Sequence, residues 1–363
     1  MKTIAISSCG IGLGHAVRDK VIFDALRQAF DVRILSYGEG YSFLSKSGVG
    51  AMNVPGMLYA QGNYSFNIFS EVLLHAVKFA TIHSNYLKFC GVLDKIKPDL
   101  ILTDSEPNAF LYAHRRSIPV IALTNVITTL NYYACLPAIV RNSSLGLQRL
   151  MLGQLVRFMR RRASVFVEPS IVSEKMDAGG VIYSDVIARE TPEKTKKANI
   201  GKDFFYVSIG SQYEAELLKY LKLSLPKFKD NYFVIASKTA VKKEQGRNFE
   251  VLPFVENPFP YMKACKGIIA PAGHTIISEA LVYKKPILVV PMKNHIEQQV
   301  NAHLVEKQGF GVACRSPEQL ERSMQRFFSG LSGFQGNVNK TDFEGKGAEQ
   351  VAGIVSSLID KSV

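Results

Sequence analysis

Short apolar runs alternate with amphipathic helical stretches along the whole chain, and this alternation limits the possible fold more than any other feature. In the first half, apolar runs at residues 3–8, 32–36 and 100–103 are separated by stretches of helical periodicity, such as residues 15–29. Strands that alternate with helices are typical of a parallel sheet covered by helices on both faces. The sequence therefore predicts an α/β, doubly wound fold.

The alternation starts again after residue 202, and 363 residues is a length typical of two domains. A charged and polar stretch separates the two halves. Ligands bind at the carboxyl ends of the strands in such sheets, so we expect a cleft between the domains. We predict a first domain over 1–188, a linker over 189–202, a second domain over 203–344 and a C-terminal helix over 345–363 that packs back towards the first domain. The glycine-containing segment 330–347 is predicted as a loop.

Composition narrows the classes of partner. The five cysteines are scattered, with no pair at metal-ligand spacing, which favours a reduced, cytoplasmic protein without a metal site. The net charge of +13 points to anionic partners, either phosphate-bearing molecules or lipid headgroups. Nucleic acid is excluded as the main partner because the chain lacks both a nucleic-acid-binding motif and the aromatic–basic alternation of single-strand binders.

A glycine turn in the second half has the form of a phosphate site. The apolar run at 267–270 leads into Gly273, His274 and Thr275, and a helical pattern follows. Such a turn directs free backbone N–H groups and the positive end of a helix dipole at one point, which suits a phosphate. Glu279, one helical turn further on, lies where it could reach the hydroxyls of an attached ribose.

A second glycine turn follows the first apolar run of the chain. Gly10 and Gly12 fit the first two glycines of a dinucleotide-binding fingerprint, but His15 stands where the third is required. The second strand also lacks the acidic residue that would bind a ribose. A dehydrogenase is therefore not expected.

Taken together, the two turns resemble the GT-B glycosyltransferases of families 28 and 1, which include enzymes that add N-acetylglucosamine to a lipid-linked precursor. The resemblance is strongest over residues 267–311, moderate over 10–18 and weak in the rest of the first half. It implies the GT-B architecture, with two Rossmann-like domains and an interdomain cleft. The first domain would bind the acceptor, and the second would bind a nucleotide-sugar donor.

On the acceptor side, the resemblance implies that His15 is the general base. A sugar hydroxyl is a weak nucleophile, and imidazole titrates near neutral pH, so it can take the hydroxyl proton during attack. Asp104, at the end of a strand, is the expected partner that orients His15, although it could instead cap the next helix. His15 itself could instead be a ligand of the donor or the acceptor. Gly12, Gly14 and Glu106 are expected at the acceptor, and Glu106 could compete with Asp104.

On the donor side, the resemblance implies several further contacts. His274 is offset from the histidine of many relatives, so either its ring or only its backbone would contact phosphate. A loop backbone would read the base, an acidic–Gln pair would bind the sugar hydroxyls, and strand ends would approach the phosphates. The loop residue would be Phe254 or Val255, the pair Glu297 and Gln298, and the strand end Gly210 and Ser211. Lys238, at the end of the next strand, could neutralise phosphate or contact the nucleoside, or it could be a solvent-exposed lysine.

The resemblance implies an inverting glycosyltransferase that needs no metal or other cofactor. The helix N-terminus and basic residues would stabilise the departing diphosphate in place of a cation. The expected donor is a UDP-sugar, and the expected acceptor is a hydroxyl of a glycan or a lipid-linked precursor of the cell envelope. Two alternatives stay open: a nucleotide-sugar 2-epimerase of the same fold, and a non-catalytic nucleotide-sugar-binding protein at a membrane.

Residues 145–162 combine an apolar helical face with several arginines. A basic amphipathic helix can lie on an anionic bilayer, but it can also pack in a core with its arginines in water. No apolar run approaches the roughly 20 residues that cross a bilayer. We expect a cytoplasmic protein that contacts the inner face of the cell membrane peripherally through this helix.

Overall fold

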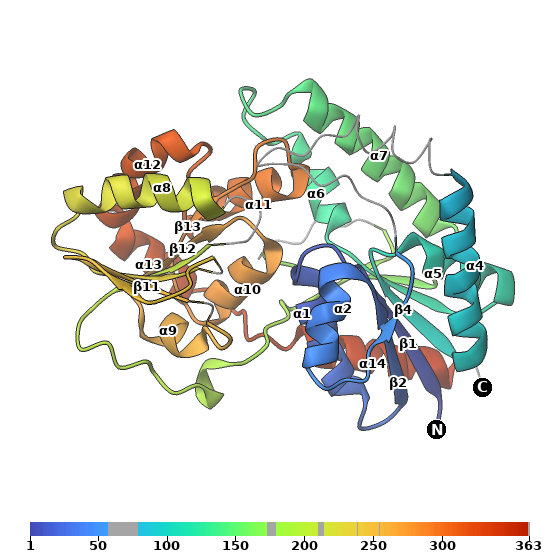
Figure 1. Ribbon diagram of the computed structural model, residues 1–363. Helices are drawn as coiled ribbons and strands as arrows, with labels where there is room; N and C mark the ends of the chain where they lie inside the picture. Colours follow the sequence, from blue (N-terminus) through green and yellow to red (C-terminus); the bar gives the residue numbers. More distant parts are fainter. Residues whose placement is uncertain (57–78, 173–178, 210–213, 238, 254, 362–363) are drawn as a thin grey trace.

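The computed structural model describes residues 1–361 except for 57–78, 173–178, 210–213, 238 and 254. These residues form two separate sheets, each with helices on both faces (Figure 1). The predicted α/β, doubly wound fold is confirmed.

The first sheet is parallel and has the strand order β3-β2-β1-β4-β5-β6-β7. The order reverses between β1 and β4, and in sheets of this kind ligands bind at that point. There the last residues of the two strands, Ser8 and Asp104, lie side by side. The strands are β1 (Thr3–Ser8), β2 (Asp31–Ser36), β3 (Met52–Asn53), β4 (Leu100–Asp104), β5 (Val120–Leu123), β6 (Val165–Pro169) and β7 (Val181–Ser184).

Alternate residues of β1 bury against opposite layers of helices. Ile4 and Ile6 face α1 (Gly14–Leu26) and the C-terminal α14 (Gly347–Asp360), whereas Ala5 faces the layer on the other side. Burial on both faces explains why Ile4, Ala5 and Ile6 in the middle of β1 are all apolar. The other helices of this half are α2 (Gly38–Lys46), α4 (Phe79–Ile96), α5 (Pro107–Arg116), α6 (Val126–Tyr133) and α7 (Ser143–Arg160).

The second sheet has the order β10-β11-β9-β8-β12-β13-β14, and it is parallel except for β10. Its order reverses between β8 and β12, so its own switch point also lies at strand carboxyl ends. The strands are β8 (Phe205–Ser208), β9 (Phe233–Ala236), β10 (Glu244–Gln245), β11 (Phe249–Leu252), β12 (Gly267–Pro271), β13 (Ile287–Val290) and β14 (Gly311–Ala313).

The helices of the second half include α12 (Leu320–Ser329) and α13 (Leu331–Asn339), which the sequence did not predict. The segment predicted as a loop contains α13, in which Val338 is buried and Phe334 stacks on Phe327. Packing against the domain outweighs the low helix propensity of its glycines. The other helices are α8 (Glu214–Ser224), α9 (Phe259–Ala264), α10 (His274–Val282) and α11 (Ile296–Lys307).

The two halves pack directly against each other. One apolar cluster contains Tyr132 and Leu136 from the end of α6 and Val300 and Leu304 from α11. The polar segment between the halves is held to the second domain by Lys263, whose Nζ donates to the carbonyls of residues 192 and 195 at 2.6 and 2.7 Å. Helix α14 returns to the first domain and packs beside α1 (Figure 1). No described helix has both the length and the apolar character needed to span a bilayer.

Candidate active site

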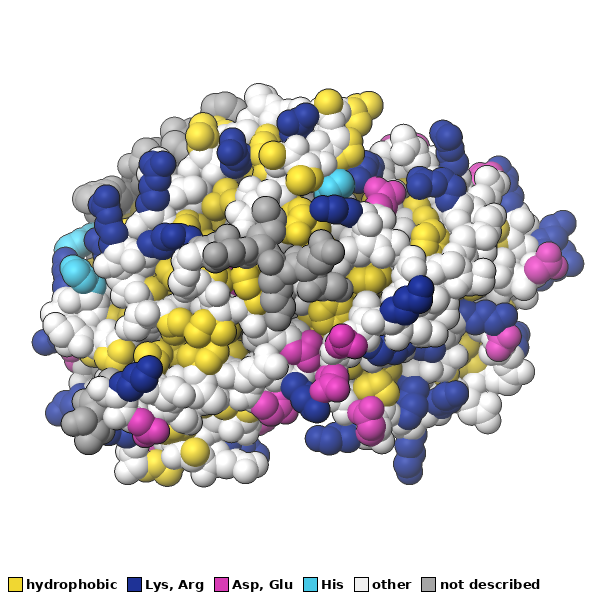
Figure 2. All heavy atoms as spheres, turned by 180° about the vertical axis from the view of Figure 1, so that it is seen from behind, with side chains coloured by type: hydrophobic (Ala, Val, Ile, Leu, Met, Phe, Trp, Pro, Cys, Tyr) yellow, Lys and Arg dark blue, Asp and Glu magenta, His cyan; other side chains and the backbone are white. Residues whose placement is uncertain are grey.

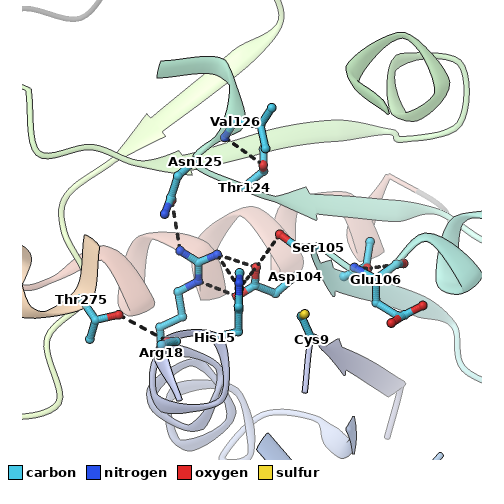
Figure 3. Close-up of polar contacts among 12 residues, drawn as sticks. Cys9, His15, Arg18, Asp104, Ser105, Glu106, Thr124, Asn125, Val126 and Thr275 are labelled. Carbon is cyan, nitrogen blue, oxygen red and sulfur yellow. Dashed lines mark hydrogen bonds and ion pairs between the residues drawn. The ribbon is translucent and has the colours of Figure 1, made fainter. Parts of the chain in front are cut away.

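Two side chains of the first domain meet on the carboxylate of a third at the β1–β4 switch point (Figure 3). The Nδ1 atom of His15 lies 2.9 Å from Oδ1 of Asp104. Arg18, one helical turn after His15, donates from Nε and Nη2 to both oxygens of the same carboxylate. We call His15, Arg18 and Asp104 the base cluster.

The glycine turn fixes where the base cluster begins. A side chain on Gly10 would come within 2.0 Å of the Tyr37 carbonyl oxygen, and Gly12 has a φ of +66°, which favours glycine. The Cys9 N–H donates to the Asp104 carbonyl at 3.1 Å, which ties the turn to the end of β4. Helix α1 therefore starts with His15 beside Asp104.

Burial and charge make Asp104 a permanent anion. Its side chain is fully buried, and burial by itself raises its pKa. The charges of Arg18 and His15 outweigh that effect and hold the pKa well below its usual range. With 28% of its side chain exposed, His15 is the member of the cluster that reaches the cleft.

Two further groups surround the base cluster. Arg18 also donates from Nη1 to Oδ1 of Asn125, at the start of α6, over 3.0 Å. Asp19 is completely buried, and neither of its carboxylate oxygens has a hydrogen-bond partner among the described residues. Burial, and then the charge of Asp104, raise the pKa of Asp19 well above its usual value. Asp104 is therefore the carboxylate that pairs directly with Arg18 among the described residues.

The glycine turn of the second domain lies opposite. Helix α10 begins at His274, and its N-cap residue Gly273 has no side chain to satisfy the first N–H groups. Oγ1 of Thr275 donates to the carbonyl of Gly14 at 3.4 Å, so the two glycine turns touch (Figure 3). The N-terminus of α10, with its positive dipole end, therefore faces the turn that carries His15.

Electrostatics also join Glu297, in the first turn of α11, to this cleft. Burial raises its pKa, but three imidazoles together with Arg18 lower it below its usual value. The three are His295, His15 and His274. Gln298, the next residue, makes a contact within its own domain: its Oε1 accepts a hydrogen bond from the Met292 N–H at 2.9 Å. The structure thus brings residues from both glycine turns into one charged site.

Glu279 has an unexpected partner. Its carboxylate, 1% exposed, accepts two hydrogen bonds from Arg189, Nε to Oε1 at 2.7 Å and Nη2 to Oε2 at 3.0 Å. The Arg189 guanidinium also lies over the Phe259 ring, 4.6 Å from its centroid. The ribose contact of Glu279 therefore stays a prediction, and it would require a ribose to share this carboxylate with the linker arginine.

Other predicted residues lie outside this meeting point. Glu106 accepts from the Asn108 N–H at 3.1 Å and so caps α5, and burial raises its pKa to about 7. Figure 3 shows its side chain on the far side of Cys9 from His15. Val255 is partly buried just before α9. Predicted contacts at Gly210, Ser211, Lys238 and Phe254 lie outside the described residues.

Sequence reasoning missed four residues with well-defined polar roles. Arg18 could have been identified from the sequence, because residues three apart on a helix lie on the same face and His15 was already a candidate. The others are Asn125, Glu168 and Arg189, which stand at a helix start, at a strand end and in a polar linker. Their partners are distant in sequence, so no local pattern marks them.

Three comparisons with known proteins bear on this geometry. A family model described as "Glycosyl transferase family 1" matches residues 3–332. An uncharacterized glycosyltransferase of Methanosarcina acetivorans is 26% identical over 334 residues, which cover 85% of this chain and 84% of that protein. A UDP-N-acetylglucosamine–N-acetylmuramyl-(pentapeptide) pyrophosphoryl-undecaprenol N-acetylglucosamine transferase of Thermosipho africanus is 29% identical over 113 residues, which cover 30% of this chain and 34% of that protein.

Among solved structures, the calicheamicin glycosyltransferase CalG4 superposes with a TM-score of 0.68 at 14% sequence identity. The match covers 99% of this chain and 98% of that one. Identity at that level speaks for the fold alone, and it agrees with the two sheets of this structure. The predicted GT-B architecture is confirmed.

Proposed function

The chain belongs to glycosyl transferase family 1, and from that premise we propose that it is an inverting, metal-independent glycosyltransferase. The donor is a nucleoside-diphosphate sugar, with UDP as the carrier. The acceptor is a hydroxyl of a glycan or a lipid-linked precursor. The observation that carries the proposal is the base cluster lying against the open N-terminus of α10.

The base cluster supports the acceptor half of the reaction. Because Nδ1 of His15 is engaged by Asp104, Nε2 is the nitrogen left to take a proton. The acceptor hydroxyl gives its proton to Nε2 as its oxygen attacks the anomeric carbon from the face opposite the diphosphate. The new C–O bond forms, the bond to the diphosphate oxygen breaks with its electron pair, and the anomeric configuration inverts. Asp104 stabilises the imidazolium that results.

The second domain supports the donor half. The backbone N–H groups at Gly273–Thr275 and the dipole of α10 stabilise the negative charge that develops on the departing diphosphate. Glu297 and Gln298 bind hydroxyls of the sugar, and Val255 presents its backbone to the base. Glu279 binds the ribose beside Arg189. Stabilisation by the helix N-terminus is why we propose that no metal ion is needed.

The first domain supports a membrane-associated acceptor. On α7, Leu150 and Met151 are 63% and 44% exposed, and Arg157 and Arg160 lie in the same helix. The pyrophosphoryl-undecaprenol named for the Thermosipho relative is a lipid-linked acceptor. We therefore propose that α7 contacts an anionic membrane on its cytoplasmic face. Figure 2 shows that on the back face Lys and Arg side chains are spread over both halves rather than gathered into the stripe that nucleic acid would require.

The experiment that tests the proposed function is a thermal-shift screen of nucleotide-sugars, followed by transfer assays with the best ligand. A ligand that binds the native state raises the midpoint of unfolding, and the rise grows with affinity. We expect UDP-sugars to stabilise the protein, and the product to have the inverted anomeric configuration by NMR, with or without EDTA. Release of free UDP and a 2-epimerised sugar without acceptor would indicate an epimerase. Binding without any turnover would indicate a non-catalytic role.

A further inference from the structure

A narrow crevice at the domain interface has no role in the proposed contacts. The first domain lines it with Asn125, Thr128 and Glu168, and the second domain with His274 and Asn301. In this arrangement it is too narrow for a water molecule. Polar residues of both domains therefore line the same narrow space.

Glu168 stands next to the end of β6 and is fully buried. Its Oε1 accepts from the Thr128 N–H at 2.9 Å and so caps the first turn of α6. Its Oε2 has no hydrogen-bond partner among the described residues. Capping of α6 uses only Oε1. Leaving a buried polar atom such as Oε2 without a partner costs about 1–3 kcal/mol. The helix cap therefore does not account for the burial of Oε2.

His274 is in the same situation on the other side of the crevice. It is 9% exposed, and its Nδ1 lies 3.3 Å from Oγ of Ser278. Its Nε2 has no hydrogen-bond partner of good geometry in the described part of the chain. A contact with the Pro169 backbone raises the pKa of the ring, against the lowering effects of burial and Arg18. The residues that line the crevice thus include one with an unpartnered buried polar atom from each domain.

Both groups are uncharged near neutral pH. Burial raises the pKa of Glu168 to about 8, and burial together with Arg18 lowers the pKa of His274 to about 4. A hydroxyl can accept from a carboxylic acid, and it can donate to or accept from imidazole, whichever tautomer is present. An anionic group can only accept, and Glu297, which is close enough to raise the pKa of Glu168, would repel it. The crevice therefore suits a neutral hydroxyl.

The position of the crevice identifies the part of the substrate that would supply this hydroxyl. Asn125 lines the crevice and also accepts from Arg18 of the base cluster. His274 begins α10, where the proposed function puts the diphosphate. In the proposed reaction, the portion of a nucleotide-sugar that lies between the diphosphate and the general base His15 is the sugar that is transferred.

We propose that Glu168 and His274 form a subsite that binds a ring hydroxyl of the transferred sugar, which makes Glu168 a determinant of donor specificity. The inference rests on the proposed function and adds a residue of the first domain to the donor site. Because the crevice is narrow here, the sugar enters with the domains farther apart, and its hydroxyl completes the contacts of both groups as they close.

The test compares the affinities of UDP and UDP-N-acetylglucosamine by calorimetry. UDP lacks the transferred sugar, so the difference between the two affinities reports on the contacts of that sugar alone. We expect Glu168→Ala to weaken binding of UDP-N-acetylglucosamine by roughly 10- to 100-fold and to leave UDP unchanged, because a buried hydrogen-bonding group is lost. Glu168→Gln keeps a neutral donor and the cap of α6, so it should retain most of the affinity. Glu250→Gln, a buried glutamate of β11 paired with Lys243, is the matched control and should change neither affinity.

His274→Leu provides a second route if Glu168→Ala does not fold. It should reduce the sugar-dependent part of the affinity, because the imidazole contact with the hydroxyl is lost. Equal loss of UDP and of UDP-N-acetylglucosamine would overturn the inference, since the crevice would then serve the nucleotide or the fold. Unchanged binding of both would overturn it as well, as would a loss seen only in acceptor KM. If the wild-type protein binds neither nucleotide, the proposed function fails, and the inference fails with it.

Discussion

The two glycine turns that meet in the cleft are built on different principles. The turn of the first domain supports charged side chains, because His15 and Arg18 converge on a carboxylate that is always ionised. The turn of the second domain offers backbone N–H groups and a neutral imidazole, and Glu279 of the same helix is paired with the linker. This difference fits the proposed reaction, in which the first domain takes up the proton of the acceptor and the second domain stabilises the negative charge of the diphosphate.

The largest effect is expected from the charged turn. His15→Ala should lower the transfer rate by roughly 10²- to 10⁴-fold, because general-base catalysis contributes about that much. Asp104→Asn should also cause a large loss in kcat, because the imidazole loses the charge that orients and stabilises it. Single-turnover kinetics with saturating donor measures both. A His15→Ala variant that keeps wild-type turnover would contradict the role of the first domain in proton transfer.

A smaller effect is expected at Glu279. Glu279→Gln should weaken UDP binding by roughly 10-fold or more, because charge-assisted hydrogen bonds to ribose hydroxyls are lost. Titration with 2′-deoxy-UDP, which lacks one ribose hydroxyl, shows whether the lost affinity comes from the ribose contact. The wild-type protein should prefer UDP over the deoxy form, and the variant should lose that preference. If both proteins prefer UDP equally, Glu279 serves only Arg189 and the linker.

The pH dependence of the free energy of unfolding should reveal the raised pKa of the buried Glu168 side chain. In the folded protein the pKa of Glu168 is about 8, against an ordinary value of 4.5. Its stabilising effect is therefore complete below about pH 4.5 and is lost as the pH rises towards 8, since the unfolded chain ionises first. His274, Arg18 and Glu297 are the charged or titratable groups that act on it.

Urea unfolding of Glu168→Gln between pH 5 and 8 checks this point. The free energy of unfolding of the variant should fall less over this window than that of the wild-type protein. Glu106, whose pKa is about 7, adds a similar slope to both proteins and cancels in the comparison. Parallel curves for the two proteins would show that Glu168 is ionised in the folded state.

The smallest effect is expected on the outer surface of the first domain. Replacing Leu150 and Met151 together with glutamate should weaken binding to phosphatidylglycerol vesicles, because apolar area is lost and repulsive charge is added. Turnover with a water-soluble acceptor should stay unchanged. Val241→Glu is the matched control, since Val241 is 97% exposed on the second domain. Equal vesicle binding by all three proteins would argue against membrane contact through α7.

The sequence predicted the parts of the molecule that local patterns encode. Strand and helix alternation gave both sheets, and the turn motifs singled out His15, Asp104 and the N-terminus of α10. It did not predict Arg18 and Glu168 in the site, because their roles depend on partners brought close only by folding. Helix α13 was missed for a related reason: its stability comes from Val338 and Phe334 packing on the domain rather than from helix propensity.

The central claim is that His15 moves a proton and does not hold the donor. The most direct measurement is the dissociation constant of UDP for His15→Ala, by calorimetry, in a preparation that has lost transfer activity. The account predicts a value within about 2-fold of the wild-type protein, which is under about 0.5 kcal/mol. A rise of roughly 10-fold or more would contradict it, because His15 would then be a ligand of the donor diphosphate.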